Sequence, residues 1–316
     1  MDTSIGTPGM WAGFLAFVLA MLLLDLFAMG GRHARKVPVH EAAVWSAVWV
    51  CLALSFNGLL WWHLDGGAGR EVANDKALEF LTGYLIEKSL SVDNIFVFLM
   101  VFGYFKVPAE YQRRVLLYGV LGAIVMRAIM ILAGAWVVQQ FHWVIYLFGA
   151  FLVLTGMKML VFADREPDLE QNPALRWMRS HLRVTAEYHG ERFMVMRDGV
   201  RWFTPLFLVL VLIEVTDLIF AVDSIPAIFA ITTDPFIVFT SNIFAILGLR
   251  ALYFLLADMA QRFHLLKYGL ALVLVFVGVK MLLVDMYKIP IGIALGVVAI
   301  IIAASVAASL AATRPR

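Results

Sequence analysis

Two short acidic segments, Glu87–Asn94 and Asp217–Ser224, lie inside long apolar runs of this chain. In each segment two carboxylates stand six positions apart, and the second follows a valine and precedes a small polar residue. A charge at the centre of a bilayer costs about 3 kcal/mol on insertion scales. Four carboxylates in two matched segments therefore predict a polar site for a cation, built from both halves of a membrane protein.

The spacing within each segment decides how the acids can act together. Six positions along an ideal helix correspond to about 600°, so the two acids point about 120° apart and differ by about 9 Å in height. One straight helix cannot aim both at a single ion. Pro226 favours a break in the second segment, because its ring clashes with the carbonyl of Val222.

We therefore expect an inner and an outer set of metal ligands. The inner set is Asp93, Asp223, Asn94 and Ser224, and the outer or access set is Glu87, Asp217 and Glu214. All are hard oxygen donors, which suit Mn²⁺, Mg²⁺ or Ca²⁺ better than Cu⁺ or Zn²⁺. Carboxylates at that depth also bind protons, so exchange of a divalent ion for protons is one coupling scheme.

The alternative for these acids is a set of structural ion pairs. Arg127, Arg250 and Lys88 lie in apolar segments and are the expected cationic partners, while Asn242 offers an amide oxygen. Lys158 and Lys280 stand near the ends of predicted helices, and we expect both to extend toward the membrane interface.

Composition limits the class of protein. The chain has 316 residues, of which 62% are hydrophobic and 15% charged, whereas soluble domains are about a quarter charged. This predicts an all-α integral membrane protein. The net charge of +2 gives no reason to expect nucleic-acid binding, and the single cysteine, Cys51, excludes an intrachain disulfide. No Gly-x-Gly-Asp, Gly-x-Ser-x-Gly or His-Glu-x-x-His motif is present, so we do not expect an enzyme.

About nine apolar segments are long enough to span a bilayer, which takes about 20 residues. They are Met10–Met29, Ala42–Trp62, Ala77–Phe102, Val115–Val138, Trp143–Phe162, Phe203–Ile231, Phe236–Ala257, Leu265–Asp285 and Ile289–Ala312. Lysine and arginine concentrate in cytoplasmic loops. An outside N-terminus and a cytoplasmic C-terminus place the basic loops, including the long polar linker, on the inner side.

The segments also repeat. The acidic motif recurs after 130 residues, and Gly156-x-Lys158-Met-Leu recurs after 122 residues as Gly278-x-Lys280-Met-Leu. The third to fifth and the sixth to eighth helices thus form two three-helix units. Because three is odd, the second unit enters from the opposite side, as in the inverted repeats of many secondary transporters. The predicted parts are two helices in 1–76, the first unit in 77–163, a cytoplasmic linker in 164–202, the second unit in 203–288, and a last helix with a short tail in 289–316.

At these motifs the chain resembles the TerC family of integral membrane proteins, and within it the Alx-like branch. The resemblance rests on Tyr84–Asn94, Glu214–Ala227, Thr232–Asn242 and Leu247–Ala251, and covers about Ala42 to Pro290. It implies export of Mn²⁺ from the cytoplasm across the bacterial inner membrane. It also implies that Glu87, Asp93, Asp217 and Asp223 contribute to the metal site.

Three readings of function compete. The main one is a secondary transporter that exports a divalent cation, and a channel is its nearest rival. The other class is a membrane protein that delivers metal to other membrane or secreted proteins, or assembles them. The expected partners are the lipid bilayer, a divalent cation and protons, with no resident cofactor.

Overall fold

The computed structural model describes residues 4–28, 38–141, 143–161, 170, 172–197, 199–257, 265–287 and 289–312, without the side chains of 25–28 and 93. Helices make up most of this part. They are α1 Pro8–Ala28, α2 Val39–Gly67, α3 Arg70–Tyr104, α4 Ala109–Gln140, α5 Val144–Val161, α6 Pro173–His181, α7 Pro205–Phe229, α8 Pro235–Leu247, α9 Leu249–Leu256, α10 Leu266–Leu282 and α11 Ile291–Ala312. Two short strands, β1 Met194–Arg197 and β2 Val200–Phe203, form an antiparallel hairpin.

Six helical segments in the described part are long and apolar enough to cross a membrane. They are α2, α4, α5, α7, the α8–α9 pair and α11. The long helix α3 carries Glu87, Lys88 and Asp93 within its apolar part, and α10 has only 17 residues. The all-α fold with several possible spans is thus confirmed, while the count of nine spans and the inverted repeat stay predictions.

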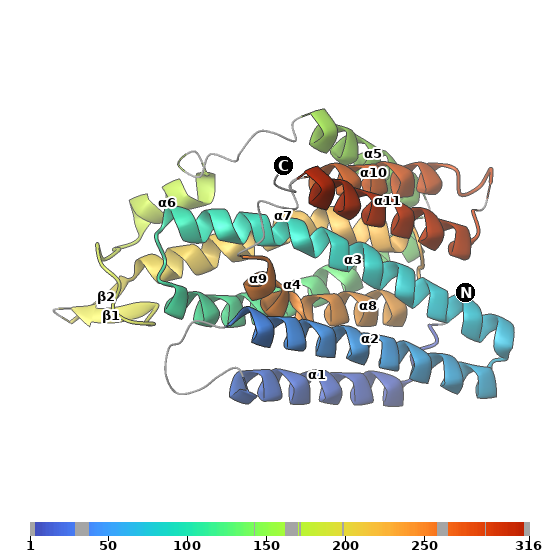
Figure 1. The fold of residues 1–316 in the computed structure, drawn as a ribbon, viewed down its shortest axis with the longest axis horizontal. Coiled ribbons are helices and arrows are strands. Elements are labelled where there is room, and N and C mark those ends of the chain that lie inside the picture. The colour runs from blue at the N-terminus through green and yellow to red at the C-terminus, as the bar shows by residue number, and fades with distance from the viewer. Residues whose placement is uncertain are drawn as a thin grey trace.

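The helices lie roughly along one common direction (Figure 1). The pair α1 and α2 runs along one side, and α5, α10 and α11 run along the opposite side. Between them lie α3, α4, α7, α8 and α9, with α3 packed on both α7 and α8, and α4 packed on α7. The two helices that carry the acidic segments, α3 and α7, are therefore central.

The expected break at Pro226 is not present in the structure. Helix α7 continues through Pro226 and ends at Phe229. A proline removes one hydrogen bond and strains the preceding turn, but only about one turn of helix follows Pro226, and the surrounding residues of α7 are buried. The break falls instead in the next predicted helix, where Gly248 separates α8 from α9.

Proline sets the starts of both α7 and α8. Pro205 and Pro235 each occupy the first turn of their helices, where the missing N–H costs nothing and the fixed φ angle suits a helix. The Asp234 carboxylate accepts a hydrogen bond from the Phe236 N–H and caps α8. This cap fixes where α8 begins after the turn that follows α7.

Helices α5 and α10 pack closely, and glycines make this close approach possible. A Cβ on Gly278 would lie 2.7 Å from the carbonyl oxygen of Gly149, and a Cβ on Gly149 would lie 3.0 Å from the carbonyl oxygen of Gly278. A Cβ on Gly156 would lie 2.8 Å from the carbonyl oxygen of Ala271. Small residues that let helix backbones approach are typical of helix packing in membranes.

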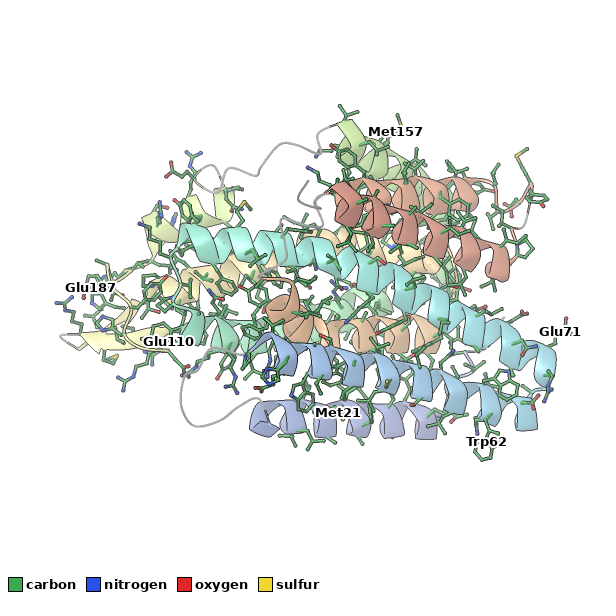
Figure 2. All side chains as sticks on the ribbon, in the orientation of Figure 1. Met21, Trp62, Glu71, Glu110, Met157 and Glu187 are labelled. Atoms are coloured by element: carbon green, nitrogen blue, oxygen red, sulfur yellow. The ribbon has the colours of Figure 1, made fainter. Side chains whose placement is uncertain are left out.

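The outer surface separates apolar flanks from charged ends (Figure 2). Trp62 and Met157 project from the flanks, whereas Glu71 lies at one end of the bundle and Glu110 and Glu187 lie at the other. Trp62 and Met157 are 71% and 53% exposed. Exposed apolar flanks between charged ends are expected of a bundle that lies in lipid.

The linker, predicted as a simple solvated connector, has structure of its own in its described part. It holds α6 and the β1–β2 hairpin at the same end of the bundle as Glu187. Leu175 and Met178 of α6 are buried against the helical core. The Tyr188 hydroxyl donates to the Phe105 carbonyl oxygen at 2.7 Å, so the linker is attached to the end of α3.

Candidate functional site

Arg127 of α4 is the centre of a polar cluster inside the bundle. Its guanidinium Nη2 donates to Asp217 Oδ1 at 2.9 Å and its Nε donates to Asp217 Oδ2 at 3.2 Å. Its Nη1 forms an ion pair with Glu87. All three side chains are at most 3% exposed. The first acid of each segment is therefore an ion-pair partner of the same arginine.

Two asparagines complete this cluster. Asn94 donates from Nδ2 to Asp217 Oδ1 at 3.0 Å, and Asn242 donates from Nδ2 to Glu87 Oε2 at 3.2 Å. The amide oxygen of Asn242 accepts from Arg127 Nη1 at 3.3 Å. Five side chains from α3, α4, α7 and α8 thus form one hydrogen-bonded cluster, which we call the central cluster. Buried charges of this kind need a partner for each ion.

A small cavity of about 20 Å³ adjoins the central cluster. Its polar walls are Glu87, Asn94, Arg127, Asp223 and Ser224, and it has room for about one water molecule. The cavity brings together both acidic segments, because its lining comes from α3 and α7 as well as α4, α5 and α10.

Two oxygen atoms beside this cavity lack a hydrogen-bond partner among the described residues. They are Asn94 Oδ1 and Ser224 Oγ, and both residues are 1% exposed. A buried polar atom without a partner costs about 1–3 kcal/mol. Such atoms are suited to ligate a cation that enters the cavity, since both are neutral hard oxygens.

The carboxylates outside the central cluster have fewer contacts. Asp223 is partly buried and accepts a hydrogen bond from Thr155 Oγ1 at 3.4 Å, with Lys158 close enough to interact electrostatically. Glu214 lies against Gly122, and its Oε2 has no hydrogen-bond partner in the described part of the chain. Asp217 adds a like charge near Glu214.

The remaining predicted residues divide into three cases. The side chain of Asp93 lies outside the described residues. Arg250 is 2% exposed and borders a second small cavity together with Asp217. Lys88, predicted to pair with an acid, donates from Nζ to the Ala245 carbonyl oxygen at 3.3 Å, beside Gly248. Among the described residues, no group of three or more His, Cys, Asp or Glu side chains is arranged to hold a metal ion.

A larger cavity, which the sequence did not predict, lies at the end of the bundle. It has a volume of about 540 Å³ and lies where α3, the α7–α8 turn and α10 meet. Its polar lining includes Lys76, Glu79, Thr232, Asp234 and Lys280, and we call it the vestibule. Glu79 stands eight positions before Glu87 on α3, and this spacing was the signal that could have identified it.

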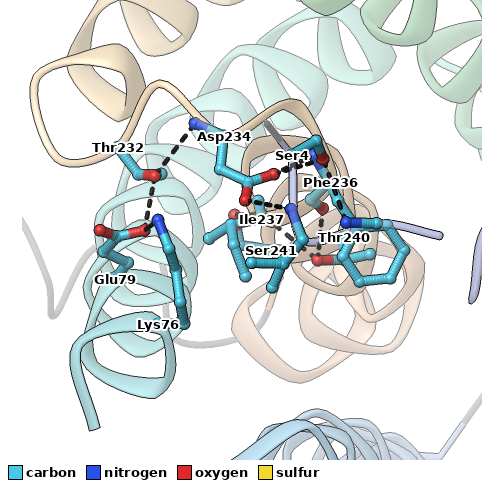
Figure 3. A network of polar contacts seen from close by, with 11 residues as sticks. Ser4, Lys76, Glu79, Thr232, Asp234, Phe236, Ile237, Thr240 and Ser241 are labelled. Carbon is cyan, nitrogen blue, oxygen red and sulfur yellow. Dashed lines mark hydrogen bonds and ion pairs between the residues drawn. The ribbon is translucent and has the colours of Figure 1, made fainter. Parts of the chain in front are cut away.

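The vestibule has its own hydrogen-bonded lining (Figure 3). Glu79 accepts from Thr232 Oγ1 at 2.6 Å and from Lys76 Nζ at 2.9 Å. Asp234 accepts from Ser4 Oγ at 2.8 Å and from the Ile5 N–H at 2.9 Å. The segment before α1 therefore lies over the start of α8.

Comparison with known proteins assigns the chain to a family. Residues 72–316 match the model described as the integral membrane protein TerC family. A protein of Escherichia coli (strain K12), whose name includes the words "membrane-bound redox modulator Alx", is 59% identical over 292 residues, which cover 92% of this chain and 91% of the relative. An uncharacterized membrane protein of Myxococcus xanthus is 50% identical over 292 residues, covering 92% and 89% of the two chains. No solved structure matches the chain. The chain therefore belongs to the TerC family of integral membrane proteins.

Proposed function

We propose that this protein is a secondary transporter that exports a divalent cation, Mn²⁺, from the bacterial cytoplasm by alternating access. One observation carries the proposal. The small cavity between α3 and α7 is bordered by the Asp223 carboxylate and by the buried Asn94 and Ser224, each with a side-chain oxygen that has no partner among the described residues. Oxygen ligands of this kind favour a hard cation.

The charges near the cavity support a cation as cargo. Glu87 and Asp217 share the single guanidinium of Arg127. Asp223 and Glu214 are carboxylates in the same helix as Asp217. A divalent ion entering beside Asp223 would be attracted by these carboxylates, and its release can be coupled to proton uptake by them.

An inverted repeat is part of the proposal, with the units 77–163 and 203–288 on either side of the linker 164–202. The α5–α10 contacts support it. Gly156 approaches Ala271, and Gly278 approaches Gly149. Adding the 122-residue offset to 149 and 156 gives 271 and 278, so the two contacts exchange with each other. This is the relation expected across a pseudo-twofold axis.

The proposed orientation follows from the same units. The linker end of the bundle faces the cytoplasm, and the vestibule end faces the outside of the inner membrane. The described linker carries Arg176, Arg179, Arg183, Arg192, Arg197 and Arg201 against Glu170, Glu187 and Glu191, which agrees with the excess of basic residues on cytoplasmic sides.

The name of the Escherichia coli relative is compatible with export. A chain with one cysteine cannot form an intrachain disulfide. A protein that changes the metal content of the cytoplasm modulates redox state without a thiol pair of its own, since Mn²⁺ is itself redox-active. The alternative, delivery of metal to other membrane or secreted proteins, differs in needing a partner before metal moves.

The test is Mn²⁺ flux into liposomes that contain only this protein, with and without a pH gradient. We expect saturable flux that is abolished in Asp223→Asn and Asp93→Asn and reduced in Ser224→Ala. Asp65→Asn is the matched control, because Asp65 is paired with Arg70 at the surface. Absence of flux with folded wild-type protein would contradict export by this protein alone and would favour delivery of metal to other proteins. Full flux in both Asp variants would make these acids structural.

A further inference from the structure

Lys280 lies in the last turn of α10, at the end of the bundle. Its Nζ donates to the Ala230 carbonyl oxygen at 3.2 Å, and the side chain is partly buried in the wall of the vestibule. Glu79 lies close enough to interact with it electrostatically. The ammonium group is therefore held by a carbonyl oxygen and lies near a carboxylate.

The position that its ammonium occupies is favourable for any cation. Helix α7 ends at Phe229, so the Ala230 carbonyl lies at the C-terminal end of a 25-residue helix. The last carbonyls of a helix carry partial negative charge and lack intrahelical donors. The Glu79 carboxylate, which is paired with Lys76 at 2.9 Å, adds an acidic side chain to the same region.

This position is aligned with the small central cavity. Asp223 and Ala230 are seven positions apart in sequence, which is about two helical turns, so they face nearly the same direction about 10 Å apart. On α3, Glu79 precedes Glu87 by eight positions, or about 12 Å along the axis. The vestibule and the central cavity therefore lie at two depths along α3 and α7, on nearly the same face of α7 and on faces of α3 that are about 80° apart.

The repeated motif strengthens the relation. Gly156-x-Lys158 and Gly278-x-Lys280 are the matched copies. Lys158 of α5 interacts electrostatically with Asp223, and Lys280 of α10 contacts Ala230. Each copy thus brings one ammonium group to α7, one near the central cavity and one in the vestibule.

We propose that the vestibule is the outer mouth of the cation path and that Lys280 is a tethered cation, which occupies the place of a divalent ion between Glu79 and the end of α7. This inference rests on the proposed function for its direction of transport. While Lys280 is in place, an external divalent ion that approaches the Lys76–Glu79 ion pair meets a second ammonium group, so Lys280 opposes re-entry of exported metal.

The test is Mn²⁺ binding to the purified full chain in detergent, followed by the electron paramagnetic resonance signal of free Mn²⁺. Lys280→Met should gain a Mn²⁺ site at least about tenfold tighter than any in the vestibule of the wild type, because a like charge is removed from a partly buried position. Lys280→Arg should resemble the wild type. Lys267→Met, at the other end of α10, is the matched control. The double variant Lys280→Met/Glu79→Gln should lose the gained site.

The outcomes separate this inference from the proposed function. A folded Lys280→Met that binds Mn²⁺ like the wild type overturns the tethered cation, whatever the flux. A gained site that survives Glu79→Gln also overturns it, since the site then lies elsewhere. Suppose that Lys280→Met gains a site that needs Glu79, but that the wild type shows no flux. The cation position at Glu79 then stands, and only the proposed transport is refuted.

A second variant covers the case in which Lys280→Met does not fold. Lys280→Gln removes the charge but keeps a polar side chain in the wall of the vestibule. It should gain the same Mn²⁺ site that Lys280→Met gains, and should lose it when Glu79→Gln is added. A folded Lys280→Gln that binds Mn²⁺ like the wild type contradicts the proposal.

Discussion

At the scale of single residues, Arg127 has the largest number of described ionic partners in the central cluster. It pairs with Glu87 and Asp217 and donates to Asn242, all of them buried. Removing one partner from a buried ion pair typically costs 3–5 kcal/mol, because the other charge is left without compensation. The stability of the bundle therefore depends on this side chain more than on any exposed ion pair.

We predict that Arg127→Met lowers the free energy of unfolding by about 3–5 kcal/mol. Arg127→Lys should be intermediate, since an ammonium group cannot bind two carboxylates with the fork of a guanidinium. The thermal unfolding midpoint of the purified protein in detergent measures both. Arg70→Met, whose side chain is 68% exposed, is the control and should change little. Equal losses for Arg70→Met and Arg127→Met would contradict the role of burial.

The residue types of this site, and Arg127 as an ion-pair partner of its acids, could be predicted from the sequence, but not which acids Arg127 binds. The acids, the asparagine and the arginine are all visible as polar residues in apolar runs. That Arg127 binds both Glu87 and Asp217, 40 and 90 positions away, depends on the packing of three helices, which local sequence does not encode. The vestibule was missed for the same reason, because Glu79 and Lys280 meet only in the fold.

At the scale of helices, the contact between α5 and α10 determines how closely the proposed units 77–163 and 203–288 approach each other. We predict that Gly278→Ala destabilises the protein by about 1–3 kcal/mol, because its Cβ would meet the Gly149 carbonyl oxygen at 2.7 Å and backbone cannot move aside cheaply. Gly58→Ala is the matched control in α2, where a Cβ meets nothing within 4 Å. It should be neutral or stabilising by about 0.5–1 kcal/mol. Thermal unfolding of both variants checks this, and a harmless Gly278→Ala refutes it.

The attachment of the linker to α3 gives a prediction with a pH dependence. Burial raises the pKa of Tyr188 above its usual value, and its hydroxyl must be protonated to donate to the Phe105 carbonyl oxygen. The stabilisation is therefore complete below the unfolded-state pKa of about 10 and is lost as the pH rises through the folded-state value.

Tyr188→Phe should accordingly speed proteolytic cleavage in the linker at pH 8. The difference from the wild type should shrink as the pH rises above about 10. Limited proteolysis with mass spectrometry of the fragments measures the rate at each pH. A wild type whose cleavage rate equals that of the variant already at pH 8 would show that the hydrogen bond does not hold the linker.

Helix positions were largely predictable because long apolar runs with few charges have one stable solution in lipid. The predictions that were wrong concern the places where helices end, where backbone propensity and tertiary packing oppose each other. Pro226 did not end α7, since packing on both sides outweighs one lost hydrogen bond, whereas Gly248 did end α8. Polar segments gave no comparable signal, so α6 and the hairpin of the linker were not foreseen.

At the scale of the whole molecule, the proposed orientation can be tested with cysteines. In a Cys51→Ser background, Glu71→Cys and Glu187→Cys place single thiols at opposite ends of the bundle (Figure 2). We predict that a membrane-impermeant maleimide labels Glu71→Cys in intact cells and labels Glu187→Cys only after permeabilisation. The reverse pattern would invert the orientation, and labelling of both in intact cells would contradict opposite sides.

The burial of α8 has a consequence for which changes the protein tolerates. In the span Pro235–Leu256, 94% of the residues in the most apolar 18-residue stretch are buried inside the protein, whereas the corresponding share in α11 is 11%. An apolar helix normally has one face toward lipid, and substitutions there are tolerated with the period of the helix. Saturation mutagenesis of α8 should show no such period, because every face meets another helix. The apolar side chains of α8 thus favour insertion into the membrane during synthesis. In the folded protein they contribute only to packing against neighbouring helices.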